Sequence, residues 1–226
     1  MIMRKYIFFI FFISLSLFTS CKDSTNNPQP GNNITVSLAI DKGMNKIGAD
    51  TIVLDTVKIL LKDIKFRQAT GDSSNVKVGP IVVKLNLNGT PTEFAAGNVI
   101  AGNYSKIKFR LHKPEDADVI SDPEFKAGSS GDLRYSVIVK GKFNSVPFIY
   151  KSTKTATQEV NLKNSINLTN DVKTNVTLSV DVNSWFYKGT LVLDPNNTVN
   201  KNDIDNNIKD SFLKAFRDSN KDGIAD

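Results

Sequence analysis

Cysteine and histidine are almost absent from the sequence, with one of each in 226 residues. The lone cysteine, Cys21, rules out a disulfide framework, so the fold must rest on its hydrophobic core. The lone histidine, His112, rules out a zinc site built from histidine and cysteine ligands. A Ser-His-Asp triad would depend on His112, and no nucleophile-elbow motif, P-loop or dinucleotide fingerprint occurs. We therefore expect no enzyme of these classes.

A strong excess of one charge is also missing. The 29 basic and 23 acidic residues give a formal net charge of +6, and Arg4 and Lys5 contribute two of these positive charges. The remaining lysines are scattered along the chain, which is not typical of a nucleic-acid-binding protein. We therefore expect no nucleic-acid partner.

One long apolar run is present, and it lies at the start of the chain. Arg4 and Lys5 precede the apolar segment 6–17, which is followed by small residues and then by Cys21. This order predicts a signal peptide over residues 1–20, and the apolar run is too short for a comfortable spanning helix. Phe18-Thr19-Ser20-Cys21 resembles a bacterial lipobox, although leucine is usual where Phe18 stands. We expect a lipid on Cys21, the alternative being a free thiol in a secreted protein.

The segment after Cys21 is polar. Residues 22–33 are rich in proline, asparagine and glycine, so residues 21–33 are predicted to be the lipidated cysteine and a flexible tether. Lys22-Asp23 partly resembles the surface-export signal of Bacteroidota lipoproteins. The expected location is the cell envelope, as a membrane-anchored outer-membrane lipoprotein on its surface or in the periplasm.

Alternation of apolar and polar residues with a period of two dominates the body. Residues 34–40, 57–66, 106–112, 133–140 and 176–182 show this pattern, with a phase shift at Lys62-Asp63 that marks a bulge. A hairpin is predicted at Gly141–Ser145. Short strands separated by turns predict an all-β fold over residues 34–195, an antiparallel β-sandwich with immunoglobulin-like or transthyretin-like layers.

The C-terminal segment, residues 196–226, has a different pattern. Ile204, Ile208, Phe212 and Phe216 are spaced four apart, which predicts one α-helix from Asp203 to Arg217 with this stripe facing the core. An acidic tail follows the predicted helix.

Three stretches resemble a domain-of-unknown-function family found in lipoproteins of Bacteroidota. They are residues 57–66 (VKILLKDIKF), residues 101–109 (AGNYSKIKF) and residues 135–141 (YSVIVKG) with Pro147-Phe148. The likeness covers roughly residues 34–190. It implies a β-sandwich on an anchored, exported protein, and it implies no catalytic residues.

The acidic tail reads D-x-N-x-D-G-x-x-D from Asp218 to Asp226. Oxygen ligands at alternate positions, with Gly223 for a sharp turn, are typical of calcium loops, but the later bidentate acid of an EF-hand is missing. The pattern predicts weak calcium binding, and the alternative is a frayed tail. The candidate ligands are Asp218, Asn220, Asp222, Ile224 and Asp226.

Two charged segments are further candidates. Lys106, Lys108 and Arg110 alternate along one strand and end at His112, so they form a positive stripe that could meet an anionic glycan or a lipid headgroup. The alternative is a solvated outer face that discourages edge pairing. An acidic loop could supply paired carboxylates to a glycosidase, or it could simply be solvated. Its acids are Glu115, Asp116, Asp118, Asp122 and Glu124.

The aromatic run Trp185-Phe186-Tyr187 is predicted to lie in the core, the alternative being a surface that stacks on sugars. Taken together, these features favour a non-catalytic binding or scaffolding module of the cell envelope, with a surface glycan or an envelope protein as its partner. The alternatives are a carboxylate-dependent hydrolase acting on glycans and a purely structural envelope component.

Overall fold

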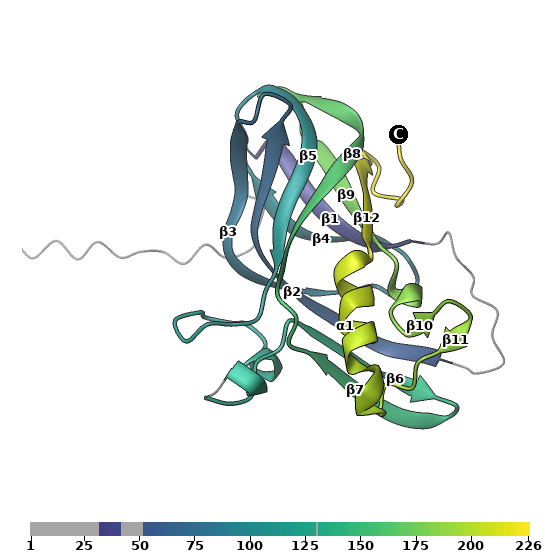
Figure 1. Ribbon diagram of the computed structural model, residues 1–226. Coiled ribbons are helices and arrows are strands. Elements are labelled where there is room, and N and C mark those ends of the chain that lie inside the picture. Colours follow the sequence, from purple (N-terminus) through teal and green to yellow (C-terminus); the bar gives the residue numbers. More distant parts are fainter. Residues whose placement is uncertain (1–31, 42–51, 130) are drawn as a thin grey trace, which may run out of the picture.

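The computed structural model describes residues 32–41, 52–129 and 131–226 (Figure 1). The predicted signal peptide, the lipidation site Cys21 and most of the tether lie outside these residues. None of the helices in the described ranges is both long and apolar enough to cross a membrane.

The described residues are mostly strands. One α-helix, α1 (Lys201–Asp210), lies near the C-terminus. The strands are β1 (Ile34–Ile40), β2 (Ile52–Gln68), β3 (Ser73–Lys84), β4 (Thr92–Gly97), β5 (Gly102–Leu111), β6 (Val137–Phe143), β7 (Val146–Ser152), β8 (Ala156–Leu168), β9 (Thr174–Val180), β10 (Tyr187–Lys188), β11 (Leu191–Val192) and β12 (Phe212–Arg217).

Most strands belong to one curled sheet in the order β4-β1-β9-β12-β8-β5-β2-β6-β7, with β3 paired to β2 (Figure 1). Its curl encloses a core that includes Val36 of β1, Ile59 of β2 and Leu178 of β9, all fully buried. The expected all-β, sandwich-like fold with one C-terminal helix is confirmed. The expectation of purely antiparallel pairing is wrong at β1–β9 and β12–β8, which are parallel. A parallel pair needs a long crossover connection, and the chain between the strands of each pair supplies one.

The predicted bulge and hairpin are both present. The register of β2 against β3 and β5 shifts around Asp63, whose φ of 57° lies in the left-handed region. The hairpin joins β6 to β7 through Asn144 and Ser145, which also have positive φ, as a tight two-residue turn requires.

The C-terminal helix is shorter than predicted. Ile204 and Ile208 of α1 are fully buried, as their spacing predicts, and Asp205 accepts hydrogen bonds from Tyr150 (2.8 Å) and Ser152 (2.6 Å) of β7. The prediction that the helix continues to Arg217 is wrong, because residues Phe212–Arg217 form strand β12 instead.

Pairing with β9 explains why the second half is a strand. β12 lies antiparallel beside β9, and Phe212 packs edge-on against Phe109 with ring centroids 5.0 Å apart. Without β12, this edge of β9 would have unpaired backbone hydrogen-bonding groups. A strand in this position pairs with them, whereas a helix packed on the sheet surface would leave them unpaired. The C-terminal segment thus completes the sheet.

Candidate functional site

The loop between β5 and β6 covers the outer face of β2. Phe125 of this loop is fully buried against Leu60 of β2 and Ile138 of β6, forming a second, small hydrophobic cluster. His112 starts the loop and is 1% exposed, with its Nε2 atom 2.6 Å from Asp118 Oδ2. The expectation that His112 lies on a polar, solvated face is therefore wrong, because the loop folds over it.

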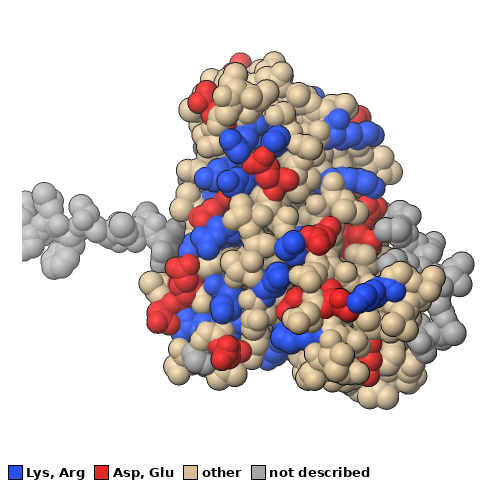
Figure 2. All heavy atoms as spheres, in the orientation of Figure 1, with Lys and Arg blue, Asp and Glu red and all other residues tan. Residues whose placement is uncertain are grey.

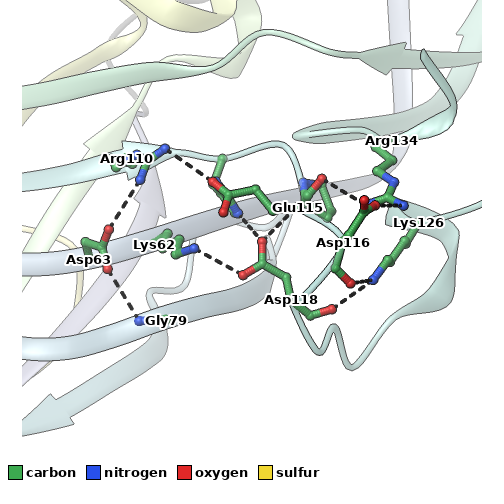
Figure 3. A network of polar contacts seen from close by, with 11 residues as sticks. Lys62, Asp63, Gly79, Arg110, Glu115, Asp116, Asp118, Lys126 and Arg134 are labelled. Carbon is green, nitrogen blue, oxygen red and sulfur yellow. Dashed lines mark hydrogen bonds and ion pairs between the residues drawn. The ribbon is translucent and has the colours of Figure 1, made fainter. Parts of the chain in front are cut away.

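The acidic side chains of the loop pair with basic side chains beneath and beside them. Lys58 contacts Asp122 and lies 2.8 Å from Glu124. Lys62 lies 3.1 Å from Asp118 (Figure 3). The expectation of a simply solvated acidic loop is wrong for Asp118, Asp122 and Glu124, because β2 places its lysines under these carboxylates, while Glu115 and Asp116 are exposed.

This pairing controls the protonation of the loop. Burial would raise the pKa of Asp118, but the Glu115 N–H, His112 and Lys62 together lower it to about 2. The pKa of Asp122 is also lowered by Lys58 despite burial, and hydrogen bonds from Lys58 and Lys140 lower the pKa of Glu124. A glycosidase needs one carboxylic acid with a raised pKa as its proton donor, and these three carboxyls have the opposite shift.

The predicted positive stripe on β5 is largely neutralised by its neighbours. Lys106 lies 2.8 Å from Glu159 of β8, and Arg110 lies 3.6 Å from Asp63 (Figure 3). Figure 2 shows blue and red atoms side by side over this face of the molecule. Lys108 stands opposite Glu159 in the β5–β8 register. The stripe has the predicted alignment. Lys106 and Arg110 are ion-paired, whereas the described residues give Lys108 no ion pair.

The first two residues of the aromatic run, Trp185 and Phe186, lie in the core as predicted, while Tyr187 is partly buried. Trp185 is fully buried and Phe186 is 1% exposed, packing edge-on against Phe148 and Tyr150. No aromatic residue is found among the exposed large hydrophobic side chains of the described ranges. A sugar-stacking surface therefore receives no support from these residues.

The side chains of the predicted calcium loop bond to one another and to β9. Asp218 is fully buried and accepts hydrogen bonds from Thr177 Oγ1 (2.6 Å), Asp222 N (3.0 Å) and Gly223 N (3.1 Å). Asn220 donates to Asp222 (2.9 Å), and Asp226 accepts from Ser219 Oγ (2.6 Å). No group of three or more His, Cys, Asp or Glu side chains in the described ranges is placed to hold a metal ion. The calcium site stays a prediction, and the observed role of Asp218 is to fold the loop.

A groove of about 740 Å³ lies beside this loop, on the outer face of β9 and β12. Its volume is within the roughly 300–1,000 Å³ of typical small-ligand sites, and its lining is mainly apolar. The lining residues include Ala39 of β1, Leu162 of β8, Ser179 of β9, Leu213 and Phe216 of β12, and Ile224 of the C-terminal loop.

The sequence produces this groove in three ways. Ala39 and Ser179 are register partners in the parallel β1–β9 pair, and their small side chains leave space above the sheet. Tyr104 and Lys106 of β5 pair with Ile166 and Asn161 of β8, so β8 has extra residues between these two positions. This bulge lies where β8 makes its single pairing to β12. Gly223, Ile224 and Ala225 of the loop 218–226 complete the lining.

Side chains at the groove opening mix apolar and charged groups. Leu213 lies at a register shift of β12 and is 49% exposed, and Ile224 is 67% exposed. Lys214 is paired with Asp41 at 2.9 Å. Lys163 of the β8 bulge also lines the groove, and among the described residues it has no ion pair or hydrogen bond of its side chain.

Sequence reasoning did not find the groove. Its residues come from four strands and a loop that are far apart in the chain, and no motif links them. The one available signal was Ile224, a bulky apolar side chain in the acidic tail. Leu213 lies within the segment that was predicted to be a helix, from Asp203 to Arg217.

Comparison with known proteins gives little further information. No protein-family model matches the chain, and no curated protein is significantly similar to it. The structure of MbnP from Methylosinus trichosporium resembles this fold with a TM-score of 0.41 and 10% sequence identity. The match covers 73% of this chain and 80% of that protein. Resemblance to the domain-of-unknown-function family stays a prediction.

Proposed function

We propose that this chain is a non-catalytic binding module of the bacterial cell envelope and that its site is the groove along β12. The observation that carries the proposal is the groove itself, an apolar hollow of about 740 Å³ bordered by two large exposed apolar side chains, Leu213 and Ile224. Exposed apolar surface costs free energy in water, and a ligand that covers it recovers about 25 cal/mol per Å². The expected ligand is a small molecule with an apolar body.

This proposal narrows the choice among the functions that the sequence left open. A glycan would need polar partners and stacking aromatics, and the groove offers neither in quantity. A hydrolase that uses Asp118, Asp122 or Glu124 as its proton donor is disfavoured by the lowered pKa values of these three side chains. A purely structural component would have no need of an open apolar groove.

The proposal includes the lipid anchor on Cys21. Substituting this residue, Cys21→Ser, removes the thiol that carries the lipid, so the protein is expected to move from the membrane fraction to the soluble fraction. Fractionation of expressing cells with an immunoblot measures this shift. A wild-type protein that is already soluble would show that no anchor is attached.

Occupation of the groove is tested with a neutral fluorescent apolar probe, 1-N-phenylnaphthylamine. The full chain carrying Cys21→Ser is expected to bind it with increased fluorescence. Leu213→Lys places a charge at the opening and is expected to weaken binding at least tenfold, since it removes apolar contact and introduces a group that must stay hydrated.

Val119→Lys is the matched control, because Val119 is 88% exposed and does not line the groove. This variant is expected to bind the probe as the parent does. Equal binding by the Leu213→Lys variant, or loss of binding in the Val119→Lys variant alone, would place the probe elsewhere and overturn the proposal.

A further inference from the structure

We infer that the ligand of the groove is an amphipathic anion, an unbranched carboxylate of the fatty-acid type, whose charged end is held by Lys163. This inference rests on the proposed function, since it names the ligand class of the same site. The groove lining requires a ligand with an apolar body, and the inference adds a polar end to that ligand.

The charges around the groove carry this inference. Two lysines line it, and the ammonium of Lys214 lies 2.9 Å from the carboxylate of Asp41. The Lys163 side chain has no such partner among the described residues. The lining therefore has one uncompensated positive charge next to apolar surface, and a ligand with one negative charge would balance it.

Lys163 can hold the charged end of the ligand because of its position on the β8 bulge. Leu162 is buried and Lys163, Asn164 and Ser165 are all exposed, so the bulge interrupts the strict alternation of the strand. The lysine stands at the edge of the groove, where an ammonium keeps its hydration while its methylenes extend the apolar wall. An ion pair here would be solvent-exposed, so its contribution is modest and sensitive to salt.

The same site argues for a single free ligand molecule rather than a membrane surface. A membrane-binding face would carry several uncompensated lysines around its apolar side chains. This groove has one, and its volume matches one ligand of ordinary size.

The test compares three ligands with the same ten-carbon chain, namely decanoate, decanol and decyltrimethylammonium. Each displaces 1-N-phenylnaphthylamine from the full chain carrying Cys21→Ser, at neutral pH and low ionic strength. Decanoate is expected to bind about threefold more tightly than decanol, in line with an exposed ion pair, and the cation is expected to bind most weakly. The added variant Lys163→Glu is expected to abolish the preference for decanoate while leaving decanol binding unchanged.

Lys173→Ala, at an exposed lysine in the turn before β9, is the matched control and is expected to keep the preference. Equal affinities for decanoate and decanol would overturn the anion inference while leaving the groove as an apolar site. Failure of all three ligands and of the probe would overturn the proposed function as well. Sedimentation with phosphatidylglycerol vesicles that depends on Lys163, without displacement by decanoate, would replace the free ligand with a membrane lipid.

Discussion

Asp218→Ala is expected to lower the free energy of unfolding by about 3 kcal/mol, an unusually large effect for a residue eight positions from the end of the chain. The Asp218 carboxylate is fully buried and accepts hydrogen bonds from Thr177, Asp222 and Gly223. Alanine would leave the Thr177 hydroxyl and two backbone N–H groups without this acceptor. Urea denaturation followed by circular dichroism measures the change.

The control for this prediction is Asp222→Ala in the same loop. Asp222 is exposed, and among the described residues its carboxylate accepts hydrogen bonds from Asn220 and Ile224 alone, so a loss below about 1 kcal/mol is expected. Equal losses for the two variants would show that the loop does not depend on the buried carboxylate. Because this loop forms one wall of the groove, Asp218→Ala is also expected to weaken probe binding.

Acid is expected to destabilise the protein between about pH 4.5 and pH 2. Asp118, Asp122 and Glu124 have pKa values below their ordinary ones in the folded protein. Their contribution to stability is fully present above the pKa values of the unfolded chain, and it is lost as the pH falls through the lower, folded values. For Asp118, a shift from 3.8 to about 2 corresponds to about 2 kcal/mol.

The Asp118→Asn variant isolates this contribution. It is expected to be about 2 kcal/mol less stable than the parent at pH 6, and the two unfolding free energies should approach each other near pH 2. Asp72→Asn removes one exposed charge in a turn and is the control for net charge. A constant difference between the parent and Asp118→Asn from pH 6 to pH 2 would contradict the assigned role of the His112–Asp118–Lys62 contacts.

Much of the fold could be predicted from the sequence, because alternation reports directly which face of a strand is buried. Residues 34–40 match β1, and the bulge at Asp63 and the hairpin after β6 follow from phase and turn residues. Strand β8 escaped prediction because its bulge at residues 163–165 breaks the alternation. Strand β12 was mistaken for a helix because Phe212 and Phe216 fit both periods, and only the open edge of β9 decides between them.

The candidate sites could be predicted only in part, because the residues that form them are far apart along the chain. The acidic loop and the stripe were visible as charges, yet whether each charge has a partner depends on strand neighbours such as Glu159 opposite Lys106. His112 looked solvated because its strand neighbours are basic, while the loop that buries it follows in the sequence. The groove joins residues from Ala39 to Ile224, so no local pattern could reveal it.

The structure separates a charged face from an apolar one. Over β2 and β5, ion pairs such as Lys58–Glu124 and Lys106–Glu159 and the small cluster around Phe125 cover the surface. Along β12, the small side chains of the sheet and the C-terminal loop leave the surface open. The second face is the one that we propose binds a ligand.

A methyl NMR titration of the full chain carrying Cys21→Ser with decanoate tests directly whether the groove along β12 is the binding site. Saturable shifts are expected for the methyl resonances of Leu162, Leu213 and Ile224, which line the groove, while those of Val119 and Val199, exposed elsewhere, stay unchanged. Unchanged groove resonances at saturating decanoate, or shifts centred on Val119 or Val199, would contradict binding in the groove.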